Sequence, residues 1–193
     1  TVEQFRKMGV PLPFEKAIQL VHWICEPLDY MAKKTEPIYH RDLKPHNIII
    51  HPDLGPVLID FGLAKQVATT SDLSITRGGS GTWTPPERES GLSGGFTDVW
   101  SLGKILYYLL TSEVPPVILD IENVRDVLDK NDRPRWLTDF IIWACWPHHE
   151  KRIQNVEQFY ILLENQGAWP EKGGVSASNL GAGSDSGDFS TWQ

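Results

Sequence analysis

One stretch of the chain decides its fold and its chemistry, and it reads His40-Arg41-Asp42-Leu43-Lys44-Pro45-His46-Asn47, with Asp60-Phe61-Gly62 following downstream. It combines a carboxylate (Asp42), an ammonium (Lys44) and a carboxamide (Asn47), and Asp60 adds a second carboxylate. Phosphoryl transfer from a nucleotide requires a base beside the attacking hydroxyl, a cation on the moving phosphoryl group and oxygen ligands for Mg²⁺. The pattern therefore indicates a phosphotransferase.

These motifs resemble the catalytic loop and the metal-binding tripeptide of eukaryotic-type (Hanks-type) Ser/Thr protein kinases. The first motif, His-Arg-Asp-x-Lys-x-x-Asn, fixes five positions, so an accidental match is rare, whereas Asp-Phe-Gly alone is a weak signal. A lysine two residues after Asp42 is typical of the Ser/Thr group. Residues 79–87 (GSGTWTPPE) and 98–103 (DVWSLG) are similar to two further segments of the same family.

The resemblance implies a mainly α fold, in which a small β-hairpin carries the catalytic and metal-binding residues. Residues 1–166 look like the C-terminal lobe of a kinase domain, without the N-terminal lobe. We expect residues 167–193 to be a flexible linker or tail, because glycine, serine and aspartate dominate there and offer little apolar surface to bury.

Catalytic roles follow from the resemblance position by position. Asp42 is expected to accept or orient the proton of the substrate hydroxyl, and Lys44 to offset charge on the transferring phosphoryl group. Asn47 and Asp60 are the expected ligands of Mg²⁺. Together with Lys44 and Ile49, they are also the residues expected to bind ATP.

Other positions are structural in the same pattern. Glu87 is expected to pair with Arg152, and Asp98 to accept backbone hydrogen bonds from the catalytic loop. His40 and Phe61 are expected in the packed core. A catalytic base role for His40 is the sharper alternative, but the core role fits the family better.

Regulation is the third expectation. Arg41 before the catalytic Asp marks family members that are activated by phosphorylation of a long loop. Thr76 stands at the spacing from Glu87 at which such members are phosphorylated, and Lys65 is expected to join Arg41 around the phosphate. Ser80 replaces a family threonine that bonds the catalytic Asp and Lys. Rival phosphorylation sites are Thr69, Thr70, Ser71 and Ser74.

Hydrophobic periodicity supports this architecture. Apolar residues recur at helical spacing from Phe14 to about Lys34, where Pro27 is expected to kink the helix or remove one backbone bond. Residues 98–111 are apolar on nearly every face, which predicts a buried central helix. Further helices are expected near 120–129, 134–146 and 155–165, and a short amphipathic segment over 1–10.

A hairpin and a loop complete the prediction. The β-branched runs 47–50 and 57–60 flank a turn rich in proline, aspartate and glycine, which predicts two antiparallel strands. Such a hairpin places Asn47 at the start of one strand and Asp60 at the end of the other, so that both face one ion. Residues 63–86 are rich in threonine, serine and glycine and predict a long mobile loop.

Bulk properties exclude several function classes. A formal net charge of −7 argues against a nucleic-acid partner, which would require a basic face. The two cysteines fall in apolar helical patterns and predict buried, reduced thiols. No apolar run is long enough to predict a membrane segment within the chain. We expect a cytoplasmic protein, or the cytosolic part of a membrane-anchored kinase.

The sequence holds no Gly-x-Gly-x-x-Gly and no Val-Ala-x-Lys motif, which in the family belong to the smaller lobe that grips ATP. We therefore expect a protein substrate, a missing small lobe or a partner that covers the nucleotide face, and little activity from these 193 residues alone. Two alternatives remain open: a pseudokinase or scaffold lobe that binds proteins, and a small-molecule phosphotransferase of the same fold.

Overall fold

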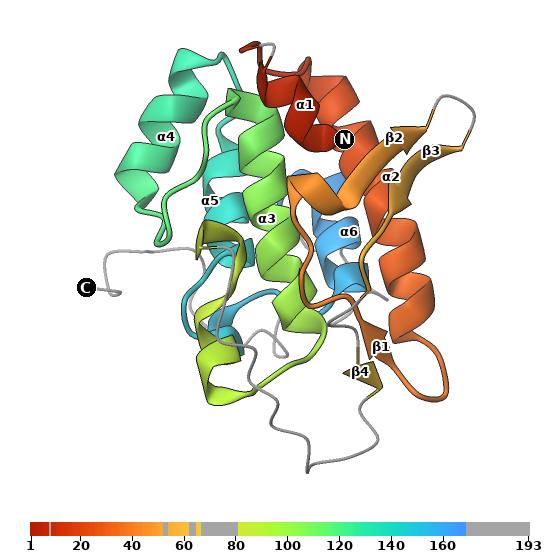
Figure 1. Cartoon of the computed structure of the whole chain (residues 1–193). Coiled ribbons are helices and arrows are strands. Elements are labelled where there is room, and N and C mark those ends of the chain that lie inside the picture. The colour runs from red at the N-terminus through yellow and green to blue at the C-terminus, as the bar shows by residue number, and fades with distance from the viewer. Residues whose placement is uncertain (8, 52–53, 62–64, 67–80, 169–193) are drawn as a thin grey trace.

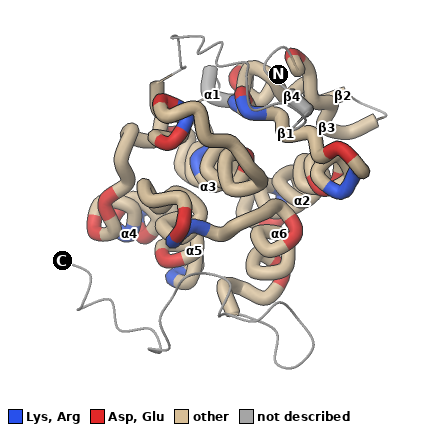
Figure 2. Tube along the Cα trace, turned by 90° about the horizontal axis from the view of Figure 1, so that it is seen from below, with Lys and Arg blue, Asp and Glu red and all other residues tan. Residues whose placement is uncertain are grey.

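The structure is a computed structural model, and it describes residues 1–7, 9–51, 54–61, 65–66 and 81–168. Its centre is helix α3, Gly95–Thr111, whose side chains are buried almost throughout. Helix α2 (Phe14–Ala32) and helix α6 (Val156–Glu164) pack along it, and α5 (Trp136–Ala144) lies against another side. Figure 2 shows the helices from below, with α4 (Ile121–Lys130) at the edge of the molecule beside α5. The helix that is apolar on nearly every face is thus the one that the others surround.

The close approach of α3 and α5 depends on one glycine. A Cβ atom on Gly103 would lie 2.6 Å from Cys145 Sγ and 2.8 Å from Ala144 Cβ. Only a residue without a side chain lets the two backbones meet at this distance. The two cysteines, Cys25 and Cys145, are buried free thiols, as predicted. Burial raises the pKa of the Cys145 thiol to about 11.

The predicted β-hairpin is present and lies against α2 (Figure 1). Strand β2 (Ile48–His51) pairs antiparallel with β3 (Gly55–Leu58), with Ile48 opposite Leu58. Asn47 precedes the first strand and Asp60 follows the second, so both residues flank the hairpin. A second pair, β1 (Ile38–Tyr39) with β4 (Lys65–Gln66), was not predicted, because two-residue strands carry no periodicity.

The remaining elements are short. Helix α1, Val2–Lys7, opens the chain, and four 3₁₀ turns follow at Pro45–Asn47 (η1), Gly81–Trp83 (η2), Pro86–Ser90 (η3) and His149–Lys151 (η4). Helix α2 continues through Pro27 to Ala32, while Ile24, Cys25 and Leu28 around it are buried. Packing of this face therefore holds the helix together across a residue that cannot donate a backbone bond.

The mainly α fold with a small hairpin is confirmed. The predicted helices near 120–129, 134–146 and 155–165 correspond to α4, α5 and α6, and α3 begins three residues earlier than predicted. Gly167, at φ 84°, donates its N–H to the Leu162 carbonyl and caps α6, so the first residue assigned to the tail still belongs to the packed unit. Residues 169–193, the rest of that tail, lie outside the described residues, as do residues 63–64 and 67–80 of the predicted loop 63–86. The end of that predicted loop instead contains η2 and the first residue of η3.

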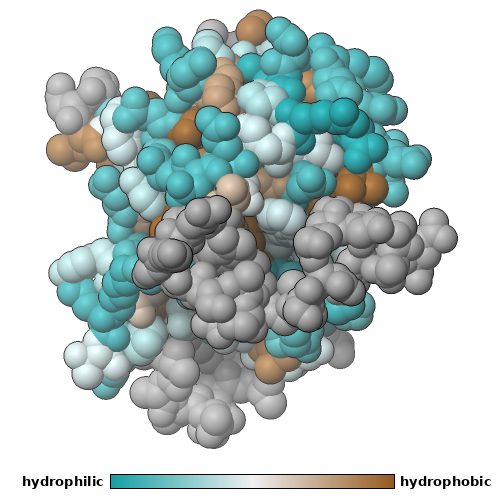
Figure 3. Space-filling view, turned by 180° about the vertical axis from the view of Figure 1, so that it is seen from behind, coloured by the Kyte–Doolittle hydropathy of each residue, from teal (hydrophilic) through white to brown (hydrophobic). Residues whose placement is uncertain are grey.

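The surface is largely hydrophilic on the side that Figure 3 shows, with scattered hydrophobic residues. Within the residues that the structure describes, none of the helices has the length and apolar character needed to cross a membrane.

Candidate active site

The catalytic loop begins with a strained turn that α3 holds in place. Arg41 has a φ of 67°, in the left-handed region that residues with side chains rarely occupy. Asp98, in the first turn of α3, accepts the His40 N–H at 2.9 Å and the Arg41 N–H at 2.8 Å. These are the backbone bonds expected of Asp98. Burial raises the pKa of the Asp98 carboxyl, and the two N–H groups act against that rise.

Three of the predicted functional side chains meet next to this turn. Lys44 Nζ lies 2.7 Å from Asp42 Oδ2. Asn47 Nδ2 donates to the Asp42 backbone carbonyl at 2.8 Å and lies 3.3 Å from Asp42 Oδ2. Fully buried Leu43 anchors the loop between them. The expected base, the expected phosphoryl-binding cation and one expected metal ligand are therefore adjacent.

Asp60 is connected to this group through the backbone. The Ile59 N–H donates to the Asn47 carbonyl at 2.9 Å, which joins the end of β3 to the start of β2. Asp60 follows with a φ of 61° and is solvent-exposed. Ile49, also assigned to the nucleotide site, lies half-buried in β2 opposite Val57. Asn47, just before β2, and Asp60, shortly after β3, thus lie at the same end of the hairpin.

The residue types fit Mg²⁺. Magnesium is commonly held by one or two protein carboxylates together with the substrate phosphates and water, rather than by a complete protein cage. Asp60 would supply one carboxylate and Asn47 one amide oxygen. Among the described residues, no three or more His, Cys, Asp or Glu side chains gather into a cluster that could hold a metal ion.

His40 and Phe61 differ from each other in burial. His40 is fully buried, as expected, and its Nε2 lies 3.2 Å from the Ile59 carbonyl. Because a carbonyl only accepts, Nε2 is the nitrogen that carries the proton in this contact. Phe61 is 39% exposed, so its assignment to the core is wrong. The chain turns at Asp60, and the Phe61 ring then covers His40 from the surface, with 4.7 Å between ring centroids.

A buried ion pair fixes the segment that contains Glu87. Arg152 donates from Nη1 to Glu87 Oε1 at 2.7 Å and from Nη2 to Glu87 Oε2 at 2.9 Å. The Arg152 side chain is fully buried, and it also donates to the carbonyls of Trp146 and Phe96. The pair expected between these two residues is present.

Helix α3 also fixes η2, inside the segment similar to the family's peptide-binding loop. Trp100 Nε1 donates to the Thr82 carbonyl and Ser101 Oγ to the Trp83 carbonyl, at 3.3 and 3.1 Å. Buried Lys104 donates to the carbonyls of Pro116 and Val117. The Lys104 ammonium and the Arg152 guanidinium lie 4.8 and 4.9 Å from the Trp100 ring. Burial lowers the pKa of Lys104 to about 8.

One residue at the site was missed from the sequence. Arg88 Nη1 donates to the Arg41 carbonyl at 3.2 Å and lies 3.9 Å from Asp42 Oδ1. Burial lowers the pKa of the Arg41 guanidinium, and the positive charge of Arg88 lowers it further. Arg88 follows Glu87 in a 3₁₀ turn, and no motif or periodicity in the sequence indicates where its side chain reaches.

The regulatory predictions fall mostly outside the described residues. Gly62, Thr76, Ser80 and the rival sites 69–71 and 74 lie there. Lys65 is described through its backbone, which pairs with Tyr39. The loop phosphorylation site and the Ser80 contact therefore stay predictions.

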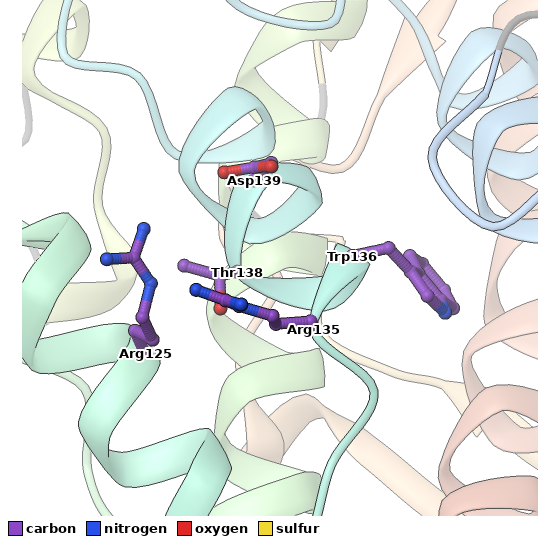
Figure 4. A pocket seen from close by; sticks show the side chains of 5 residues that line it. All are labelled: Arg125, Arg135, Trp136, Thr138 and Asp139. Carbon is purple, nitrogen blue, oxygen red and sulfur yellow. The ribbon is translucent and has the colours of Figure 1, made fainter.

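A cavity of about 290 Å³ lies away from these motifs, between α4 and α5 (Figure 4). Its lining residues are Arg125, Arg135, Trp136, Thr138 and Asp139. Figure 4 shows the Arg135 side chain extending toward α4 and the Arg125 side chain, while Trp136 points away. Burial raises the pKa of the Asp139 carboxyl, and the two arginines oppose this rise. None of the predicted catalytic residues lines this cavity.

Comparison with known proteins gives the same family as the motifs. The family model described as the protein kinase domain matches residues 3–160. The chain is 35% identical over 124 residues to serine/threonine-protein kinase PknB of Mycobacterium leprae, covering 60% of the chain and 20% of that protein. A probable PknB of Lactococcus lactis is 33% identical over 170 residues, covering 82% of the chain and 27% of that protein.

A third relative extends the match over more of the chain. A probable serine/threonine-protein kinase of Clostridium acetobutylicum is 30% identical over 181 residues, covering 86% of the chain and 27% of that protein. The chain therefore spans about a fifth to a quarter of the length of these curated relatives.

Proposed function

This chain belongs to the protein kinase family, and on that premise we propose that it is the large catalytic lobe of a Ser/Thr protein kinase, which transfers the γ-phosphoryl group of ATP to hydroxyl groups of protein substrates. The observation that carries the proposal is the contact of Lys44 and Asn47 with Asp42, at 2.7 and 3.3 Å from one carboxylate oxygen. A purely structural role for this loop would not require a carboxylate, an ammonium group and an amide to lie together beside a strained turn.

Asp42 acts as the base in this proposal. Its side chain is 12% exposed, so its carboxylate can reach a bound hydroxyl while being largely shielded from water. Proton transfer by a positioned base contributes about 10²- to 10⁴-fold to catalysis. Lys44 contacts Asp42 with one of its three N–H donors, which leaves two for the oxygen atoms of the transferring phosphoryl group.

Asn47 and Asp60 hold the Mg²⁺ that accompanies ATP. When bound, the ion would offset the negative charge that develops on the nucleotide phosphates. The Asn47 amide can donate to Asp42 through Nδ2 and offer its oxygen to the ion at the same time. This arrangement ties the direction of one metal ligand to the base.

A protein substrate agrees with the segment that carries Thr82 and Glu87. The Glu87–Arg152 pair and the bonds from α3 to η2 make this segment a rigid extension of the core. A rigid loop beside the base is suited to align an extended peptide. Phosphorylation of Thr76, with Arg41 and Lys65 around the phosphate, remains our proposal for regulation.

Nucleotide binding needs a second surface. The phosphate-gripping motifs of the small lobe do not occur in these 193 residues. We propose that a small lobe or a partner protein covers the nucleotide face, and that the chain alone phosphorylates peptides poorly. The need for ATP and the two buried free thiols support a cytoplasmic setting.

The experiment compares peptide phosphorylation by the full-length protein with that by the 193-residue chain alone. Full-length protein is expected to phosphorylate serine- or threonine-containing peptides with Mg²⁺ and ATP, and Asp42→Asn is expected to abolish this. Asp129→Asn, an exposed carboxylate on α4, is the matched control. Equal activity of the Asp42→Asn and wild-type proteins would contradict the proposed function. Strong activity of the 193-residue chain alone would contradict the need for a second surface.

A further inference from the structure

Arg88 lies in a segment whose backbone is held in place by the buried Glu87–Arg152 pair. It lies in η3, Pro86–Ser90, directly after Glu87, whose carboxylate is held at two points by buried Arg152. The Arg88 N–H donates to the Pro85 carbonyl at 3.2 Å, and Gly91 ends the turn at φ 76°. Its side chain therefore starts from a fixed backbone.

The side chain of Arg88 crosses to the catalytic loop. Its guanidinium donates to the Arg41 carbonyl at 3.2 Å, which is the directional contact. It also lies 3.9 Å from Asp42 Oδ1, whereas Lys44 lies 2.7 Å from Oδ2. The two oxygens of the base thus face two different cations. The planar guanidinium has five donors, so it can serve a carbonyl and stand beside a carboxylate together.

The hydrogen bond from Arg88 is made to Arg41, the residue with the strained backbone. A left-handed conformation of a residue other than glycine persists only where the surrounding structure holds it. At Arg41, with φ 67°, Asp98 takes the N–H and Arg88 takes the carbonyl. The peptide groups on both sides of Arg41 are therefore bound by side chains from different elements, η3 and α3.

We propose that Arg88 is a positioning residue for the catalytic base: it holds Arg41 in its left-handed conformation and so fixes the direction of the Asp42 carboxylate. The role as base rests on the proposed function, whereas the hold on Arg41 does not. Through Glu87 and Arg152, the same contact couples the position of the peptide-binding segment to that of the base.

Native-state hydrogen exchange of the 193-residue chain tests the hold on Arg41. The reporters are the His40 and Arg41 amides, which Asp98 protects, and the Leu106 amide of α3 is the global reference. Arg88→Gln is expected to speed exchange of the two reporters by roughly five- to tenfold, the effect of losing one hydrogen bond, while Leu106 stays unchanged. Arg88→Lys keeps the positive charge, and its exchange rates at His40 and Arg41 are expected to lie between those of wild type and Arg88→Gln.

Arg125→Gln is the matched control, because Arg125 lines the distant cavity and has no role in the catalytic loop. Unchanged exchange at His40 and Arg41 in Arg88→Gln would overturn the proposal. An equal acceleration at Leu106 would overturn it as well, because Arg88 would then merely stabilise the whole fold.

Kinetics of the full-length protein test the consequence for the base. Where wild-type protein phosphorylates a peptide, Arg88→Gln is expected to lower kcat about tenfold with little change in the peptide KM, and Arg88→Lys to recover part of the loss. An unchanged kcat overturns the positioning of the base. Wild-type protein without phosphotransfer activity would count against the proposed function, and the exchange experiment would still decide the hold on Arg41.

Discussion

Arg152 and Glu87 meet through two parallel hydrogen bonds of 2.7 and 2.9 Å, and both side chains are almost completely buried. Glu87 precedes α3 and Arg152 follows it, 65 residues apart in the sequence, so the pair joins the segments before and after the central helix. Two-point pairing with a carboxylate is the geometry for which arginine is suited. The segment that precedes α3 thereby becomes part of the core.

Removing Glu87 should destabilise the chain strongly. Glu87→Ala leaves the Arg152 guanidinium buried without its counter-charge, and breaking such a pair costs about 3–5 kcal/mol. Urea unfolding of the 193-residue chain measures this loss. Lys33→Ala, which removes exposed ion pairs with Asp29 and Glu157, should change stability little. Equal effects of the two substitutions would contradict a buried role for the pair.

Lys104 should make stability depend on alkaline pH. Burial lowers its pKa to about 8 in the folded chain, from an ordinary value of 10.5. Between these two values the unfolded chain holds the proton and the folded chain does not, so the free energy of unfolding should rise with pH. Lys104→Met removes this contribution. Because Tyr107 and Cys145 also titrate at alkaline pH, the measured quantity is the difference between wild type and variant in urea unfolding at pH 7.5 to 10. A difference that stays constant over this range would show that Lys104 does not titrate there.

Gly103 should not tolerate a methyl group. The Cβ of alanine would lie 2.6 Å from Cys145 Sγ and 2.8 Å from Ala144 Cβ, so α3 and α5 would have to separate. Overpacking of this kind costs about 1–3 kcal/mol, which is expected in thermal unfolding of Gly103→Ala. Asn123→Ala, at an exposed position of α4, provides the comparison. A melting temperature of Gly103→Ala at or above that of wild type would refute the close packing.

Asp60 should be needed for magnesium-dependent activity. Asp60→Asn removes the one carboxylate of the proposed metal pair, and the lost stabilisation of charge is expected to lower phosphotransfer by the full-length protein about 10²-fold. Titration with Mg²⁺ at fixed ATP should show a weaker apparent affinity for the metal. An unaltered Mg²⁺ dependence would remove Asp60 from the metal site.

Two kinds of feature could be predicted from the sequence: helices with strong hydrophobic periodicity, and contacts between residues of the recognised motifs. The buried α3 followed from its apolar residues on every face, and the bonds of Asp98 and Glu87 followed from motif positions. Phe61 was misplaced because its burial depends on the turn at Asp60, which hydrophobicity does not report. The contacts of Arg88 and Lys104 depend on tertiary placement: Arg88 reaches a loop far earlier in the chain, and Lys104 binds carbonyls beyond the end of its own helix.

The bond between Asp98 and the strained turn has a consequence for how the molecule can be controlled. Asp98 ties the turn that aims the base to the innermost helix, whereas Arg88 reaches the same turn from η3. Loss of the Arg88 contact would therefore loosen the turn while α3 stays closed. A reversible off-state can thus begin at η3, without denaturation of the whole chain.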